Sequence, residues 1–387
     1  MFAIRIAYRL HPLQVSSKRV SSLSNDESTR RRVQSHSPRD QNLRRRNNNK
    51  RLRSKGTSSK GMATNSAKTI FLTPDASSAL ISPEDVRQNL SSFKILDASW
   101  YMPFVQRSPK CEFQVSRIKN SQFFDVDKVS DLNEKSLPHM LPNEKAFAMA
   151  CDALDIDNDS DVVIYDRADN GIFSAARLWW MFKVFGHGGS VRVLNGGFKA
   201  YEKLYSEDAN GMDTNEVTTD VVEKSERACV EAYEKGDSVT TKYKAKLDTS
   251  RLATAESVKK DVCETNAKQC VDARPKGRFE GTTPEPRAGL ACGCIPNSKN
   301  VPFPEVLDAE TGKFKDAERL KQVFQEAGME LDNQSKKIVA TCGTGVTACI
   351  LTLGMHEVGR DDVEVYDGSW CEWGSRSDVP VKTAAST

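Results

Sequence analysis

The residue with the clearest chemical potential is Cys342, which lies between an apolar run at 338–341 and a second apolar run at 348–351. The five residues between the cysteine and the second run are Gly343, Thr344, Gly345, Val346 and Thr347. This pattern predicts a strand, a short loop and a helix, so that main-chain N–H groups surround the cysteine. These groups and the helix dipole stabilise a thiolate, which predicts that Cys342 is a nucleophile and that the loop binds an anionic substrate. The alternative is a small buried thiol at a strand end.

The segment that must position this loop belongs to a larger unit that occurs twice. From about residue 69 the sequence alternates between strand-like and helix-like patterns, which predicts an α/β fold with mostly parallel sheets. Three pairs of segments match in register, namely 95–98 with 270–273, 162–166 with 338–342 and 193–198 with 365–370. We therefore predict an N-terminal domain at 69–205, a linker rich in acidic residues, Ser and Thr at 206–244, and a C-terminal domain at 245–380.

The formal net charge of +3 hides an uneven distribution along the chain. Residues 1–68 hold 17 of the 56 Lys and Arg residues but only three acidic residues, so the rest of the chain is acidic overall and is not expected to bind nucleic acid. Residues 1–62 are predicted to be a disordered basic leader, a transit peptide that is mitochondrial rather than plastid because of its arginine content. The alternatives are a basic tail that binds nucleic acid or a membrane surface, and a shorter cytoplasmic form that starts at Met62.

Hydropathy and the metal-binding residue types exclude further classes of protein. The mean hydropathy is −0.55, and no apolar run approaches the ~20 residues of a membrane span, which excludes a transmembrane protein. No pair among the five histidines has metal-ligand spacing, and Cys292 and Cys294 lack a second Cys or His pair nearby, so a zinc site is not expected. Ten cysteines without a secretory-type apolar segment indicate free thiols in a reducing compartment.

Six segments carry a resemblance to a known family. They are 96–101, 137–142, 173–182, 281–287, 340–347 and 366–370. Over roughly residues 69–380 the chain resembles the tandem rhodanese-domain sulfurtransferases, which implies two rhodanese-like domains, each a mostly parallel sheet flanked by helices. Within that family the loop at 343–347 is similar to the mercaptopyruvate type, whereas thiosulfate-preferring members place charged side chains at the positions of Gly343 and Thr344. An uncharged loop suits a monocarboxylate, and a cationic loop suits the thiosulfate dianion.

The resemblance implies a sulfurtransferase that needs no cofactor. Cys342 would take sulfur from 3-mercaptopyruvate as a persulfide, release pyruvate, and pass the sulfur to thioredoxin, a small thiol or cyanide. A thiosulfate sulfurtransferase that uses the same cysteine is the alternative, and a non-catalytic sulfur carrier is expected only if Cys342 is buried. A phosphatase of the same fold is disfavoured, because that class needs an arginine after the cysteine and residues 343–348 contain none.

The resemblance also implies roles for five further side chains. Arg278 and Arg287 would bind the carboxylate and keto oxygen of 3-mercaptopyruvate, since a planar guanidinium matches that planar group. Asp127 and His139 from the first domain would join Thr344 in a relay that handles the proton of the substrate thiol or of the cysteine. A helix-capping aspartate and a structural loop histidine are the alternatives at these two positions.

The sequence departs from the family at several points. The first domain carries Asp166 where the second carries Cys342, and a carboxylate cannot accept sulfur, so this domain is predicted to be inactive and to form one wall of the cleft. The family usually carries a Gly-His-Ile-Pro-Gly run in each domain, but residues 116–120 and 293–297 lack the histidine. Its replacement in the second domain, Cys294, is hypothesised to form a redox pair with Cys292, against the alternative of two independent thiols.

Overall fold

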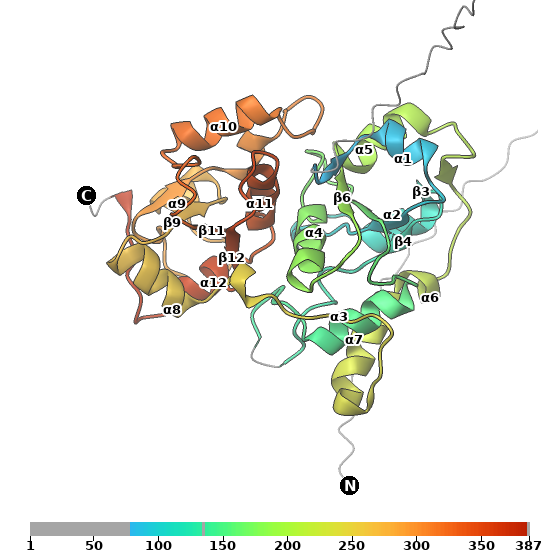
Figure 1. Cartoon of the computed structure of the whole chain (residues 1–387), viewed down its shortest axis with the longest axis horizontal. Coiled ribbons are helices and arrows are strands. Elements are labelled where there is room, and N and C mark those ends of the chain that lie inside the picture. The colour runs from blue at the N-terminus through green and yellow to red at the C-terminus, as the bar shows by residue number, and fades with distance from the viewer. Residues whose placement is uncertain (1–77, 134–135, 385–387) are drawn as a thin grey trace, which may run out of the picture. The chain divides into compact units, whose positions relative to one another are not determined.

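The computed structural model describes residues 78–133 and 136–384, which Figure 1 shows as coloured ribbon. The predicted leader at 1–62, the alternative start at Met62 and the predicted beginning of the first domain at residue 69 lie outside the described residues. The described part contains two five-stranded sheets and one two-stranded sheet. None of its helices combines the length and apolarity that a membrane crossing demands.

The first sheet is parallel throughout and has the strand order β1-β6-β5-β2-β4. Its strands are β1 (Leu80–Ile81), β2 (Lys94–Asp97), β4 (Gln122–Phe123), β5 (Val162–Tyr165) and β6 (Val191–Leu194). Asp97 pairs with Tyr165, so the two central strands end at the same edge of the sheet. Asp166 follows at that edge and begins the loop that leads into helix α4 (Ala175–Val184).

The second sheet repeats this topology, which confirms the predicted duplication. Its order β10-β9-β11-β12-β8 is the order of the first sheet read from the other end. Its strands are β8 (Leu252–Ala253), β9 (Gln269–Asp272), β10 (Ser298–Asn300), β11 (Ile338–Thr341) and β12 (Val363–Tyr366). Asp272 pairs with Thr341 as Asp97 pairs with Tyr165. Cys342 therefore occupies the strand end that corresponds to Asp166.

Helices pack on both faces of the sheets, because the central strands are apolar on both faces. Along β5, Val162 and Ile164 belong to one cluster of buried side chains, and Val163 and Tyr165 belong to another. The helices of the first domain are α1 (Pro83–Gln88), α2 (Pro109–Val115), α3 (Glu144–Ala153), α4 and α5 (Gly197–Tyr205). Those of the second are α8 (Ala255–Val258), α9 (Lys276–Glu280), α10 (Ala317–Glu326), α11 (Ala348–His356) and α12 (Ser369–Trp373). The predicted α/β class is confirmed.

The two domains share one apolar core through α4 and α11, which lie side by side in Figure 1. Both helices are apolar around most of their circumference, with Trp180 and Phe182 in α4 and Ile350 and Leu353 in α11 buried. A helix that is apolar on all sides requires burial on all sides, and contact between the two domains supplies it. Each helix begins directly after the loop at its strand end, so this interface also positions both loops.

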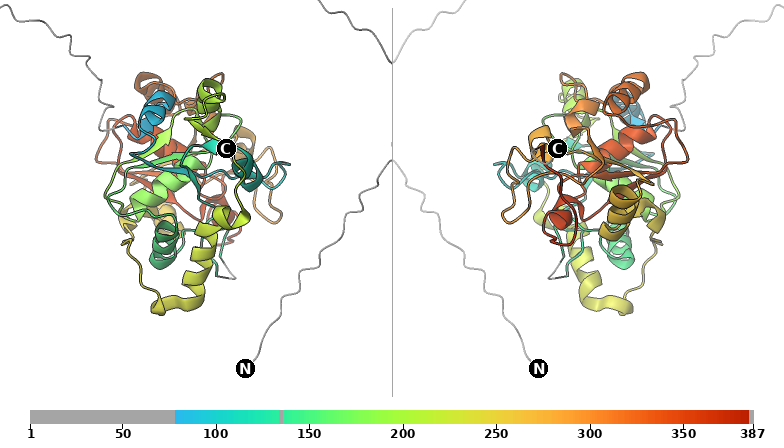
Figure 2. Two further views of the ribbon diagram at one scale, coloured as in Figure 1. Left: turned by 90° about the vertical axis from the view of Figure 1, so that its right-hand side faces the viewer. Right: turned by 90° about the vertical axis from the view of Figure 1, so that its left-hand side faces the viewer.

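The segment predicted as a linker contains regular structure. Strand β7 (Met212–Asp213) pairs antiparallel with β3 (Arg117–Ile118), and helices α6 (Thr219–Val222) and α7 (Lys224–Lys235) follow. The buried residues of α7 are Ser225, Ala228, Cys229 and Ala232, which recur at helical spacing. This stripe packs on α3, beside which α7 lies in Figures 1 and 2. The stripe consists of small residues, so a composition dominated by charged and polar side chains hides it.

Candidate active site

Cys342 is held at the end of β11 through both of its main-chain groups. Its N–H donates to the Ser369 hydroxyl at 3.1 Å, and its carbonyl accepts the Trp370 N–H at 3.0 Å. Ser369 adopts a left-handed φ of 47°, and its hydroxyl donates to the Tyr366 carbonyl at 2.7 Å. The turn after β12 therefore fixes the main chain of the cysteine without engaging its thiol.

The main-chain N–H groups of the loop after Cys342 are unpaired in the part of the chain that the structure describes. Among the described residues, none accepts a hydrogen bond from the N–H of any residue from 343 to 347. Most of these residues are buried, and buried N–H groups are normally paired. Helix α11 begins at Ala348, so its N-terminal dipole adds positive potential at the same place. These are the features that an anion-binding loop requires.

In the first domain, the same strand end binds its own side chain. The carboxylate of Asp166 accepts the N–H groups of Ala168 at 3.1 Å, Phe173 at 2.8 Å and Ala175 at 2.7 Å. Burial raises the pKa of Asp166, and these three hydrogen bonds oppose the rise. The fold therefore directs N–H groups at this position in the first domain, where a carboxylate uses them. In the second domain a thiol replaces the carboxylate.

Gly345 gives the loop its shape. Its φ is +76°, and a Cβ atom at this position would lie 2.9 Å from the Asp367 carbonyl oxygen and 3.0 Å from Nη1 of Arg177. Any other residue would be both strained and crowded. On the other side of the loop, Nη2 of Arg278 would lie 3.2 Å from a Cβ added to Gly343. The loop is thus bounded by one arginine from each domain.

The two arginines predicted to bind substrate differ in their electrostatic surroundings. Arg278 donates from Nε to Glu285 at 3.0 Å and from Nη2 to the same carboxylate. The side chain of Glu285 is only 2% exposed and also pairs with Arg274 at 2.7 Å. Arg287 is half-buried and forms no ion pair or hydrogen bond with another described side chain. The charge of Arg287 is therefore free to meet a substrate carboxylate, whereas that of Arg278 is already partly neutralised.

The thiol of Cys371 lies within electrostatic range of both arginines and of the predicted nucleophile. Burial raises the pKa of the Cys371 thiol, Cys342 adds to the rise, and the charges of Arg287 and Arg278 oppose it. The Cys371 N–H donates to the Gly343 carbonyl at 2.9 Å, and Gly343 is also the residue that Nη2 of Arg278 approaches. Cys371 and Arg278 therefore both lie beside the loop that follows Cys342.

His139 and Asp127 also meet, but Thr344 is not joined to them. His139 Nδ1 lies 3.3 Å from Asp127 Oδ1, an ion-pair distance at which the geometry does not make a hydrogen bond. The imidazole is buried with its ring against Trp100, and the two ring centres are 4.5 Å apart. The Thr344 side chain is buried too, and its hydroxyl forms no hydrogen bond with another described residue. Of the predicted three-residue relay, the structure assembles one pair.

The protonation of His139 gives a testable prediction. Burial lowers its pKa to about 4, the charges of Arg177, Arg287 and Lys128 act in the same direction, and Asp127 opposes them. An unfolded histidine titrates near 6.5, so only the unfolded chain gains this proton between pH 6.5 and 4. Stability is therefore lost as the pH falls through that window, by about 2 kcal/mol between pH 7 and 5.

The measurement is urea unfolding at pH 7 and pH 5 of the wild type and of His139→Gln. Between pH 7 and pH 5 the variant should lose about 2 kcal/mol less unfolding free energy than the wild type. Equal losses in the two proteins would contradict a neutral, buried His139.

Cys342 is 2% exposed, and burial is the condition under which a non-catalytic carrier is expected. Its surroundings argue otherwise, because a structural thiol requires neither a loop of unpaired N–H groups after it nor a guanidinium beside that loop, as Arg278 is beside Gly343. The Arg278 side chain is 17% exposed and Arg287 is half-buried, so arginines line the part of the site that meets solvent. An anion that approaches the cysteine from there meets positive charge first.

Cys292 and Cys294, the hypothesised redox pair, are not joined by a disulfide in the structure. All ten cysteines are free thiols. Cys292 is exposed, whereas Cys294 is buried and exchanges both main-chain hydrogen bonds with Lys382. These main-chain bonds fix Cys294 in the interior, which agrees with two independent thiols.

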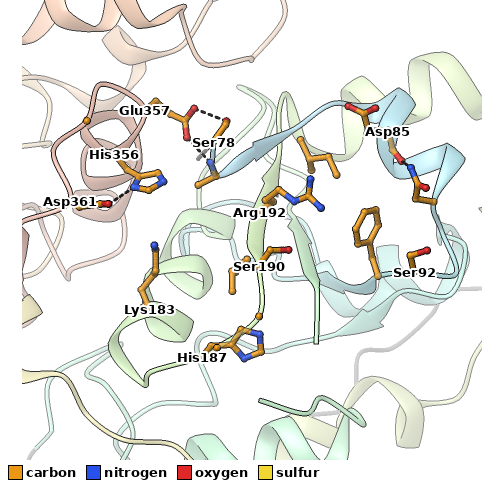
Figure 3. A pocket seen from close by; sticks show the side chains of 18 residues that line it. Ser78, Asp85, Ser92, Lys183, His187, Ser190, Arg192, His356, Glu357 and Asp361 are labelled. Carbon is orange, nitrogen blue, oxygen red and sulfur yellow. Dashed lines mark hydrogen bonds and ion pairs between the residues drawn. The ribbon is translucent and has the colours of Figure 1, made fainter. Parts of the chain in front are cut away.

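Figure 3 shows a cavity of about 1010 Å³ whose lining includes Lys183 and His356. These residues lie at the C-terminal ends of α4 and α11, whereas Cys342 precedes the N-terminal end of α11. The polar lining of the cavity includes Lys183, His187 and Arg192 from the first domain and His356, Glu357 and Asp361 from the second. None of the described residues that line it is a cysteine. The predicted chemistry therefore does not take place in this cavity.

Sequence reasoning missed four side chains that shape the site. They are Arg177, Glu285, Asp367 and Ser369. For Ser369 a signal existed, because the matching residue of the first repeat is Gly197, and both have positive φ. The same match pairs the Trp370 N–H with Cys342 and the Phe198 N–H with Asp166. Two repeats compared position by position would have shown that this turn holds the strand end.

Comparison with known proteins agrees with the duplication. Residues 82–204 and 254–376 each match the Rhodanese-like domain. An Arabidopsis thaliana protein named thiosulfate/3-mercaptopyruvate sulfurtransferase 1, mitochondrial, is 46% identical over 298 residues, which cover 76% of this chain and 75% of that protein. The 3-mercaptopyruvate sulfurtransferase of Mus musculus is 39% identical over 310 residues, which cover 79% of this chain and 94% of that protein.

A solved structure shows the same arrangement. The Tum1 protein of Saccharomyces cerevisiae is similar with a TM-score of 0.66 and 30% sequence identity, and the match covers 80% of this chain and 99% of the yeast chain. Both domains are therefore shared, together with their connection.

Proposed function

The chain belongs to the rhodanese family of sulfurtransferases, and we propose that it transfers sulfur from 3-mercaptopyruvate through a persulfide on Cys342. The enzyme class follows from the family, because relatives that are 39% and 46% identical are named sulfurtransferases. A non-catalytic carrier is set aside for the same reason. The geometry of the second domain supports Cys342 as the sulfur-carrying residue, whereas the preferred donor and the acceptor are proposed from the family resemblance and the residues of the loop.

The observation that carries the proposal is the set of unpaired N–H groups at residues 343–347 beside the Cys342 thiol. A persulfide places its outer, negatively charged sulfur one bond beyond Sγ, where these groups would bind it. The first domain supports this interpretation, because the carboxylate of Asp166 fills the equivalent groups and leaves no room for a transferred sulfur. We expect the first domain to be inactive for this reason.

In the first step the thiolate of Cys342 attacks the sulfur of 3-mercaptopyruvate. The new S–S bond forms as the C–S bond breaks, and the electron pair of that bond leaves with carbon as the enolate of pyruvate. Arg278 and Arg287 would hold the carboxylate and the enolate oxygen. The proton of the substrate thiol ends on the enolate carbon, which gives pyruvate.

In the second step an acceptor removes the outer sulfur. A thiolate attacks that sulfur, the S–S bond breaks, and Cys342 leaves as the thiolate that began the cycle. Thioredoxin or a small thiol would leave as a persulfide, and cyanide would leave as thiocyanate. The N–H groups that bound the outer sulfur then stabilise the released thiolate, so one loop serves both steps.

His139 is proposed to handle the proton of the first step. At neutral pH the imidazole is uncharged and has a ring nitrogen that can accept a proton, although its lowered pKa makes it a weak base in the free enzyme. Asp127 lies at ion-pair distance and would stabilise the imidazolium that forms. Thr344 would complete the relay only if its hydroxyl turns toward His139 when substrate binds.

One assay distinguishes 3-mercaptopyruvate from thiosulfate as the preferred sulfur donor. The loop carries no charge at residues 343 and 344, which favours a monocarboxylate over the thiosulfate dianion. Pyruvate formation from 3-mercaptopyruvate and thiocyanate formation from thiosulfate are measured side by side, each with cyanide as acceptor. We expect kcat/KM for 3-mercaptopyruvate to be higher by about tenfold or more. Comparable or better use of thiosulfate would make the thiosulfate sulfurtransferase the correct choice.

Mitochondrial import is proposed from the leader composition together with the name of the Arabidopsis relative, which includes the word mitochondrial. A plastid location, or a cytoplasmic form that starts at Met62, remains the alternative.

A further inference from the structure

Arg177 lies outside the predicted site, yet its guanidinium contacts two parts of it. The residue belongs to the first turn of α4 in the first domain and is 1% exposed. Its Nη1 lies 2.7 Å from Asp367 Oδ1 and 3.4 Å from the Gly345 carbonyl oxygen, and its Nη2 donates to the His139 carbonyl. One side chain thus joins the loop of the nucleophile to the loop that carries His139.

The contact with Gly345 sets the direction of a neighbouring N–H group. In a trans peptide the carbonyl and the following N–H point in opposite directions. The Gly345 carbonyl accepts hydrogen bonds from Arg177 and from the Cys349 thiol, the latter at 3.2 Å. While that carbonyl is held, the Val346 N–H must point away from Arg177, and it belongs to the N–H groups that have no acceptor among the described residues.

Asp367 extends the same link into the first domain. Its Oδ2 accepts the Leu141 N–H at 2.8 Å, two residues beyond His139. The side chain of Asp367 is 7% exposed, so the ion pair with Arg177 is buried on both sides. Burial of two charges carries a desolvation penalty that often cancels their attraction, so such a pair is a weak source of stability.

The internal repeat shows that the fold does not require this charge. Counted from the helix starts and the matched strand ends, Arg177 corresponds to Ile350 and Asp367 corresponds to Asn195. Asn195 makes the equivalent hydrogen bond between the domains, because its side-chain oxygen accepts the Phe314 N–H at 2.8 Å. On the side of Asp166, the two equivalent positions hold the neutral residues Ile350 and Asn195. Only the side of Cys342 has charged residues, Arg177 and Asp367, at these positions.

We propose that Arg177 is a positioning residue for the reaction, which directs the N–H groups that bind the transferred sulfur and holds His139 beside them. It acts through Gly345 and His139 and does not touch the substrate. The inference rests on the proposed function, because the direction of these groups matters only if Cys342 carries the sulfur.

The test replaces the charged residues by the neutral residues at the equivalent positions, which are Ile350 in the second domain and Asn195 in the first. The double variant Arg177→Ile, Asp367→Asn leaves no unpaired buried charge and is expected to fold with an unfolding temperature close to that of the wild type. In the full chain, with 3-mercaptopyruvate and cyanide, kcat should fall by about 10²-fold, as after loss of an oxyanion-hole donor. KM should stay within about threefold, because Arg278 and Arg287 are unchanged.

A second variant and a matched control separate positioning from stability. Arg177→Lys keeps the charge but cannot reach all three partners, so it should lose part of kcat even if the double variant fails to fold. Arg360→Lys is the control, since Arg360 is equally buried, pairs with Asp362 and donates to carbonyls far from the site. It should lower the unfolding temperature and leave kcat unchanged.

Two results would overturn the inference. One is a folded variant of Arg177 whose kcat lies within about threefold of the wild type. The other is a loss of kcat that Arg360→Lys reproduces, since that would make the effect one of general stability. Mass spectrometry of the wild type after donor treatment distinguishes a third case, because absence of added sulfur on Cys342 refutes the proposed function itself and the inference with it.

Discussion

Replacing Cys342 by serine is expected to abolish sulfur transfer while the protein stays folded. A serine hydroxyl remains protonated at neutral pH and cannot form a persulfide, so both half-reactions are lost. The hydrogen bonds that hold this position join main-chain groups to Ser369 and Trp370, and the substitution leaves them in place. Pyruvate formation measures the loss, and thermal unfolding compared with the wild type measures the fold.

The same assignment predicts which cysteine carries the transferred sulfur. Wild type treated with 3-mercaptopyruvate, without an acceptor, should gain the mass of one sulfur atom on Cys342. Fragment ions must separate Cys342 from Cys349, because no Lys or Arg lies between them for trypsin to cleave. Cys292→Ser is the control, since it removes an exposed thiol of the same domain and should change neither result. Sulfur on another cysteine, or transfer by Cys342→Ser, would contradict the assignment.

The architecture could be predicted because its causes are local and occur twice. The run 162–165 is made of apolar and aromatic residues, and the run 338–341 is apolar up to its last residue, Thr341, as expected for strands that are covered on both faces. The spacing from Asp97 to Asp166 nearly equals that from Asp272 to Cys342, and the structure gives both pairs the same register. Periodicity and repetition therefore predicted the strand end on which the nucleophile lies.

The contacts that tune the site could not be predicted, because they join positions far apart in the sequence. Nothing local to Arg177 distinguishes a buried arginine that meets Gly345 from a solvated one. The division of charge between Arg278 and Arg287 depends on Glu285, which reaches back across the loop to two arginines at once. Such pairings follow from the packing of the two domains, and neither composition nor periodicity encodes it.

Because Glu285 neutralises part of the charge of Arg278 and none of that of Arg287, the two arginines should contribute unequally to kcat/KM. Arg287→Met should lower kcat/KM for 3-mercaptopyruvate by about 10²- to 10³-fold, the equivalent of about 3–4 kcal/mol for a charged partner lost from a shielded site. Arg278→Met should cost only about tenfold, because Glu285 already offsets that charge in the free enzyme. Steady-state kinetics with 3-mercaptopyruvate and cyanide give both values.

The second half-reaction shows whether the arginines act on the donor alone. Once the carboxylate has left as pyruvate, neither arginine has a substrate group to bind, so cyanide should remove sulfur from a preloaded persulfide of Arg287→Met as fast as from wild type. Arg287→Lys keeps the charge but not the planar fork, and its kcat/KM should lie between those of wild type and Arg287→Met. Equal losses for the two methionine variants would contradict the unequal charge of the two arginines. A slow cyanide step would mean that Arg287 acts on the bound sulfur and not on the carboxylate of the donor.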